Sequence, residues 1–172
     1  MIIGYEVKVD CLDEKTGKLE VLLRIKFDLS KEAIKKFVTQ NLNTIAKYDS
    51  NFREDIKEKI NKEILNIIEN KYECVKCSIR DIATECIDDL EARYTYWDEE
   101  NEDIFNIVFL ESKHNVKNSL VFVDAYVRVQ TLMYLISRIL LSILWEEAVE
   151  RMKTNKKRKT IFNLRNEANL LS

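Results

Sequence analysis

Four cysteines offer the first candidate chemistry in this 172-residue chain. Cys74 and Cys77 stand three residues apart, and two thiolates at this spacing share one tetrahedral zinc ion when two further ligands reach it. Cys86 is the candidate third ligand, with Cys11 or His114 as the fourth. A buried cysteine also packs as a small apolar side chain. Because no second Cys-x-x-Cys pair accompanies the first, we favour core cysteines over a zinc site or a redox pair, and we expect no cofactor.

An acid and a lysine, Glu111 and Lys113, end the apolar segment IFNIVFL. Magnesium-dependent nucleases of the PD-(D/E)xK type use an acid-x-Lys pair at such a place, where carboxylates hold the ion and the lysine helps to activate a water. Asp88 or Asp89 would face Glu111 if a hairpin closes near Glu100. The same triplet occurs elsewhere in this highly charged chain, and the segment after Lys113 alternates like a strand where that family has a helix. We therefore expect no catalytic residues and keep a nuclease as the less favoured alternative.

The strongest charge asymmetry is the basic run KTNKKRK at residues 153–159. Its cationic members are Lys153, Lys156, Lys157, Arg158 and Lys159. Such side chains displace the counterions condensed on nucleic-acid phosphates, so nucleic-acid association through this run is an alternative function. The whole chain carries a net charge of -2, whereas a general nucleic-acid binder is more often strongly basic. Cations also favour a helix C-terminus, and a solvated helix end is the simpler interpretation.

The segment TLMYLISRILLSILWEEAVERM, residues 131–152, is apolar on most faces for its first four turns. A helix of this kind is covered on most faces, and a small domain covers one side of it. The other side then needs a partner, so we expect a homodimer or docking to another protein. The anchors we predict are Tyr134, Ile136, Leu140, Leu141, Leu144 and Trp145. The apolar run is shorter than the roughly 20 residues of a membrane span and contains Arg138, so we expect no span.

Hydrophobic periodicity places these candidates on an α+β fold. A β-hairpin is expected first, with Gly17 in the turn, followed by two amphipathic helices that begin at Ser30 and near Asp49-Ser50. A strand over 72–79 and a short helix come next. The strands of a meander then follow at 92–97, 104–110 and 120–129, before the long apolar helix. The expected fold is a mostly antiparallel sheet, formed by the N-terminal hairpin and a three- or four-stranded meander, packed against helices.

Asp124 interrupts the last of the expected strands, and Arg138 interrupts the long helix. A covered carboxylate needs a cationic partner, and Arg128 or Arg138 is the candidate. We expect this pairing to be structural.

Composition limits the remaining choices. We predict one domain over residues 1–153 and a basic, polar tail over 154–172. The chain has no proline and two glycines, which disfavours the glycine-rich loops that cradle phosphates. The N-terminal residues lack the pattern of a signal peptide, so we expect a cytoplasmic protein with free thiols. The sequence favours a non-enzymatic accessory, adaptor or inhibitor-like protein, compatible with a phage or mobile-element origin.

Overall fold

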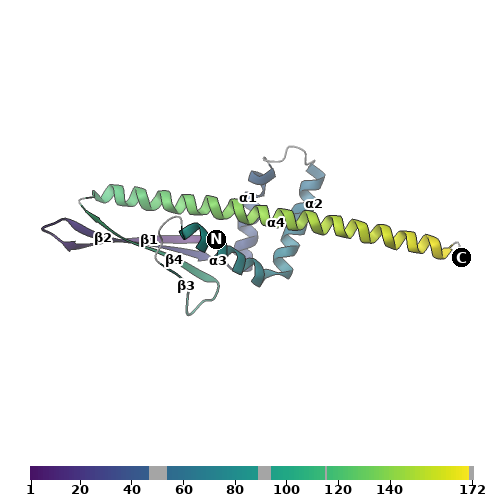
Figure 1. The fold of residues 1–172 in the computed structure, drawn as a ribbon, viewed down its shortest axis with the longest axis horizontal. Coiled ribbons are helices and arrows are strands. Elements are labelled where there is room, and N and C mark those ends of the chain that lie inside the picture. Colours follow the sequence, from purple (N-terminus) through teal and green to yellow (C-terminus); the bar gives the residue numbers. More distant parts are fainter. Residues whose placement is uncertain (47–53, 89–93, 115, 171–172) are drawn as a thin grey trace.

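The computed structural model describes residues 1–46, 54–88, 94–114 and 116–170, and these form an α+β fold (Figure 1). Four antiparallel strands make one sheet in the order β1-β2-β4-β3. The strands are β1 (Ile2–Asp13), β2 (Lys18–Asp28), β3 (Tyr94–Trp97) and β4 (Ile104–His114). The helices are α1 (Lys31–Ala46), α2 (Glu54–Asn70), α3 (Tyr72–Asp88) and α4 (Asn118–Leu170).

The predicted N-terminal hairpin is confirmed. β1 and β2 pair in antiparallel register from Ile2 opposite Phe27 to Asp13 opposite Lys18. Gly17 has a φ of 65°, the left-handed conformation that glycine adopts without steric cost. The Asp13 carboxylate accepts a 2.8 Å hydrogen bond from the Lys15 backbone N–H, which fixes the start of the turn.

Ser30 caps helix α1, as its residue type predicts. Its hydroxyl accepts a hydrogen bond from the Ala33 backbone N–H at 3.4 Å, so one of the free N–H groups of the first turn has a partner. The side chain of Asp28 accepts from the backbone N–H of Ser30 at 2.9 Å and orients the cap. The second expected start, at Asp49-Ser50, lies outside the described residues.

The predicted strand over 72–79 is wrong, because this segment begins helix α3. The buried residues of α3 are Val75, Ile79, Ile82, Ala83 and Cys86, which recur at helical spacing. A strand would have placed Cys77 beside Val75 and Ile79 in the core, whereas Cys77 is exposed. The few apolar residues of 72–79 fit a strand and a helix alike. The helical stripe is longer, since it continues to Cys86, and it buries more apolar side chains.

The predicted strand over 120–129 is also wrong, since these residues form the first turns of α4. Val121, Ala125 and Val129 are buried four residues apart, while Val123 and Val127 are exposed. β4 pairs with β2 along its length and with β3 over Phe105–Val108, so this part of β4 has no free edge for a further strand. α4 continues to Leu170, so the predicted tail over 154–172 is helical as far as that residue.

The core lies between one face of the sheet and the four helices. Alternate residues of β2 and β4 supply the sheet side: Val21, Leu23, Ile25, Phe27, Phe105, Ile107 and Phe109. α4 lies along the sheet with its first half and beside α1, α2 and α3 farther on (Figure 1). Its buried residues run from Val121 to Ala148, so one helix is packed against every helix and the sheet.

Two isoleucines on α4 test this packing with the same chemical change. Ile136 is fully buried and Ile143 is 45% exposed. We expect Ile136→Ala to lower the free energy of unfolding by about 3 kcal/mol, because it removes buried methyl groups and leaves a cavity. Ile143→Ala is the matched control and should change it by less than about 0.5 kcal/mol. Urea denaturation of both variants measures the difference, and equal losses would contradict the observed face of the helix.

Candidate functional site on helix α4

The first half of α4 presents an uncharged apolar face to solvent, here called the α4 stripe. Its members lie opposite the buried residues Val121, Ala125 and Val129, at the three- and four-residue spacing of one helix face. The stripe consists of Leu120, Val123, Tyr126, Val127, Gln130 and Tyr134. Each of its five apolar members is more than half exposed. Exposed large apolar side chains gathered on one face mark an interaction site more often than scattered ones do.

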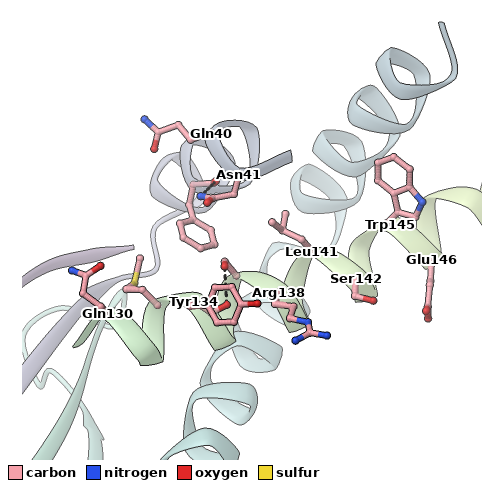
Figure 2. Close-up of a pocket in the computed structure, with 12 residues that line it drawn as sticks. Gln40, Asn41, Gln130, Tyr134, Arg138, Leu141, Ser142, Trp145 and Glu146 are labelled. Atoms are coloured by element: carbon pink, nitrogen blue, oxygen red, sulfur yellow. Dashed lines mark hydrogen bonds between the residues drawn. The ribbon is translucent and has the colours of Figure 1, made fainter. Parts of the chain in front are cut away.

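The stripe leads directly into a groove between α1 and α4, here called the α1–α4 groove, of about 700 Å³. Its floor is apolar, with Phe37 from α1 and Leu141 from α4 both buried. Tyr134 and Trp145 add aromatic surface along α4, and Arg138 is among the polar residues around the floor (Figure 2). An apolar floor with a few polar groups is the usual composition of a binding groove.

Two of the three charged residues in the first half of α4, Asp124 and Arg128, belong to an ion cluster between α4 and β4. Lys113 donates a 2.8 Å hydrogen bond to Asp124 and lies 3.2 Å from Glu111. Arg128 lies 3.4 Å from Asp124 and also pairs with Glu111. The expected pairing of Asp124 with an arginine is confirmed, with Arg128 as the partner. Both α4 charges are therefore neutralised locally, and neither is a member of the stripe.

Two members of this ion cluster, Asp124 and Lys113, have pKa values shifted in the direction that favours their charged forms. The hydrogen bond from Lys113 lowers the pKa of Asp124. Burial lowers the pKa of Lys113, but the bonds to Asp124 and Glu111 outweigh burial and raise it overall. Lys113 consequently stays protonated at neutral pH and cannot serve as a proton acceptor.

The nuclease candidates Glu111 and Lys113 are part of the same cluster. A helix, α4, does follow Lys113 after a short link, so the expectation of a strand there is wrong and the order of elements matches that family at this point. Yet a magnesium ion at Glu111 would have to compete with Arg128 for the carboxylate. Neither the Asp88 side chain nor Asp89 lies within the described part of the chain.

The cysteines of the zinc candidate are not gathered at one place. Cys74 and Cys77 are exposed on α3, whereas Cys86 is buried in the core. Cys11 is exposed on β1, and His114 is exposed at the end of β4. No group of three possible metal ligands occurs among the described residues. The expectation of a core cysteine fits Cys86 and is wrong for Cys77, which lies off the buried stripe of α3.

The predicted anchors of the long helix divide into two sets. Four of them are buried by the chain's own residues: Ile136, Leu140, Leu141 and Leu144. Tyr134 is half exposed where the stripe meets the groove, and Trp145 is partly buried along the groove. The sequence reasoning missed Leu120, Val123, Tyr126 and Val127, because their segment was taken for a strand. The helical spacing from Leu120 to Tyr134 is the pattern that identifies them.

A second polar cluster, also missed, joins α3 to the turn before β4. Lys76, 7% exposed, donates a 2.9 Å hydrogen bond to Asp103. The Tyr72 hydroxyl donates to the same carboxylate oxygen at 2.6 Å. The lysine ammonium also lies 5.2 Å from the centre of the Trp97 ring, a cation–π distance.

The protonation states of this cluster argue for a structural role. The bonds from Lys76 and Tyr72 lower the pKa of Asp103. Burial and the neighbouring Asp103 raise the pKa of Tyr72, so the phenol stays protonated. Burial lowers the pKa of Lys76, but the hydrogen bond to Asp103 and the charges of the nearby carboxylates together outweigh burial and raise it overall. None of the three is poised to exchange a proton near neutral pH, as an acid–base catalyst must.

Comparisons with protein-family models, curated proteins and solved structures found no match to this chain. By length and composition alone, the part of α4 at Asn118–Thr160 is apolar enough to cross a membrane. In its most apolar 18-residue window, 33% is buried by the rest of the chain. The core helix of a soluble protein has the same length and composition, so the property does not by itself assign a span.

The Lys76–Asp103 pair is tested by Asp103→Asn. The change leaves the buried Lys76 ammonium with only the exposed Glu73 carboxylate, 3.8 Å away, and we expect the free energy of unfolding at neutral pH to fall by about 2 kcal/mol. Since the folded pKa of Asp103 is lowered, its contribution is present above the unfolded pKa and is lost as pH falls through the folded value. Wild type should therefore lose more stability than the variant between about pH 5 and pH 3.

Urea denaturation at several pH values measures both effects. Glu99→Gln, which changes an exposed acid in the same turn, is the control and should behave like wild type. If the free energy of unfolding of wild type and of Asp103→Asn changed with pH in parallel, the Lys76–Asp103 pair would not be a stabilising interaction.

Proposed function

We propose that this chain is a non-enzymatic interaction protein that self-associates through the outward side of α4. The observation that carries the proposal is the continuity of the α4 stripe with the α1–α4 groove. A second copy is the occupant that this surface fits, because one patch then holds both a projecting part and a hollow. A closed two-fold dimer needs such a self-complementary patch.

An antiparallel arrangement of two α4 helices matches the projecting part to the hollow. With the two-fold axis level with Leu132, Val123 of one copy lies opposite Leu141 of the other at the groove floor, and Leu120 lies within one residue of the level of Trp145. The stripe and the groove together span residues 120–145 of α4, roughly 40 Å at the rise of a helix. Each copy then inserts its stripe into the groove of its partner, and both halves of the patch are covered.

The same arrangement places the few polar groups usefully. Tyr126 lies opposite Arg138, so the guanidinium can stack on the exposed aromatic ring. Glu146 lies opposite Ser119, in the first turn of the partner's α4. A carboxylate is favourable there because the free N–H groups of a helix start carry partial positive charge. Antiparallel helices also bring opposite ends of their dipoles together, which adds to the complementarity.

The exposed area is of the size that a stable dimer needs. The five apolar stripe residues are each more than half exposed. A fully exposed aromatic side chain presents about 200 Å² and an aliphatic one somewhat less, so the half-exposed residues of the stripe supply roughly 450 Å² per chain. A standard protein interface buries about 800 Å² per partner. The groove residues bring the total into that range.

Other occupants of the same surface account for less of it. A helix that crosses a bilayer alone would have to leave the sheet, because the Lys113–Asp124 and Arg128–Glu111 pairs tie it to β4. Exposing these charged groups to hydrocarbon is costly. An unrelated protein partner would use the stripe and groove equally well but would not require both in one patch. The self-complementary shape favours a second copy.

The proposal predicts that Val127→Lys abolishes self-association. Val127 is 53% exposed, so lysine is tolerated in the free chain, whereas the dimer would bury two uncompensated ammonium groups near its centre. We expect the wild type to have the molar mass of two chains and the variant that of one, with the apparent Kd raised at least about 100-fold. Light scattering on a sizing column measures both masses.

Ile143→Lys is the matched control, since Ile143 is 45% exposed and lies off the stripe. It should remain dimeric. A wild type that is monomeric at about 100 μM would overturn the proposal, because this concentration is far above the Kd expected for an interface of this size. A Val127→Lys variant that keeps the dimer mass would overturn it too. Thermal denaturation of each variant shows that the fold is intact. If the monomeric wild type floats with lipid vesicles, the stripe serves a membrane instead.

A further inference from the structure

Beyond the last packed turn, α4 carries an isolated cationic segment at residues 151–160. The last fully buried residue of the helix is Ala148, and the helix extends past the body of the molecule as it continues to Leu170 (Figure 1). Every residue from 153 to 160 is exposed. The segment 151–160 contains six lysines and arginines and no acid.

Most of these cations have no acidic neighbour. Arg151 and Lys153 are the exceptions. Arg151 pairs with Glu147 at 2.8 Å and approaches Glu63. Lys153 lies 3.9 Å from Glu150. The next four cations, Lys156, Lys157, Arg158 and Lys159, form no salt bridge within the described part of the chain. Their charges are therefore available to an external anion.

The cations also point to more than one side of the helix. Lys153, Lys156 and Lys157 line one shallow hollow together with Thr160. Arg158 lines a different hollow with Arg151, on the side of the helix where Glu63, Glu147 and Glu150 of the body also lie. A segment with positive charge on several sides suits a ligand that surrounds it better than one that lies flat against a single face.

The rest of the molecule has the opposite sign. The whole chain has a net charge of -2 although residues 151–160 are strongly positive, so the remainder carries an excess of acid. A polyanion is repelled by such a body and attracted to the projecting segment. The charge distribution thus confines binding to one end of α4.

We propose that residues 151–160 bind the phosphate backbone of duplex nucleic acid. An α-helix with its side chains is about 10–12 Å across, which matches the major groove of about 12 Å in B-form DNA. Cations on several sides of an inserted helix reach the phosphates of both strands. The segment contains no aromatic residue, so it lacks the stacking platform of single-strand binders. Binding is through phosphates and carries no base-sequence preference.

An anionic membrane surface is less well matched to the same segment. A helix that lies in a bilayer interface needs an apolar side as well as a cationic one. Residues 153–160, KTNKKRKT, include no apolar residue. The segment would meet lipid headgroups by charge alone, which leaves the duplex as the ligand that uses its shape.

The test is the binding of a 5′-fluorescein-labelled mixed-sequence DNA duplex of about 30 base pairs, followed by anisotropy from about 50 to 200 mM salt. Wild type should bind with a slope of log K against log salt of about -4, as expected for four to five phosphate contacts. The variant with glutamine at the four unpaired cations, Lys156, Lys157, Arg158 and Lys159, should bind at least about tenfold more weakly, with a slope near zero.

The matched control replaces four exposed lysines of the body with glutamine, namely Lys8, Lys15, Lys26 and Lys59. It has the same net charge as the segment variant and should retain wild-type binding and slope. Equal binding by the segment variant, or loss of binding in the control, would overturn the proposal. So would a wild type that ignores the duplex at the lowest salt, or one that binds only phosphatidylserine–phosphatidylcholine vesicles. Circular dichroism verifies that both variants keep their helix content. None of these outcomes depends on the dimer, since Val127→Lys should bind the duplex as well.

Discussion

The packing of one 53-residue helix against the sheet and the other helices is the constraint on which the structure depends. α4 meets the sheet through Val121 and Ala125 and continues to Ala148 among the helices. Its neighbours lie on different sides along its length, so its buried side changes as well. The sheet covers one face over the first turns, and the helices cover another farther on. Among the described elements, α4 is the one that packs against the sheet and against all three other helices.

The outward surface of α4 follows directly from this geometry. Where only the sheet covers it, the opposite face is left open, and there the chain has valine, leucine and tyrosine in place of charged residues. Where α1 flanks the helix, the same side becomes the α1–α4 groove, with Phe37 and Leu141 at its floor. A projecting stripe and a hollow on one helix are the parts of a self-complementary surface, and they arise because α1 reaches only part of α4.

Charged residues are arranged in two different ways along α4 and its neighbours. Near the body, each buried or half-buried charge has a close partner: Lys76 with Asp103, and Lys113 with Asp124. These pairs fix α3 and α4 to the ends of strands, since a charge removed from water is costly unless it is paired. Past the packed turns of α4 the pattern reverses: Lys156, Lys157, Arg158 and Lys159 are exposed and form no salt bridge with the described residues. The first arrangement stabilises the fold, and the second leaves charge for a ligand.

The sequence by itself determined the α+β class, the N-terminal hairpin with Gly17 in its turn, and the Ser30 cap. It also showed that the long C-terminal helix is apolar on more faces than an ordinary surface helix. These follow from local periodicity and turn chemistry, which act within a few residues. It did not determine that residues 72–79 and 120–129 are helical, because the apolar residues of both segments fit the alternation of a strand as well as the spacing of a helix. Whether each segment is a strand or a helix depended on which of its side chains could be buried. β4 already had two neighbouring strands, and Val121, Ala125 and Val129 of the helix pack on the face of the sheet. The tertiary structure therefore decided which α4 residues are core and which are surface, since burial is a property of distant segments brought together and not of spacing along the chain.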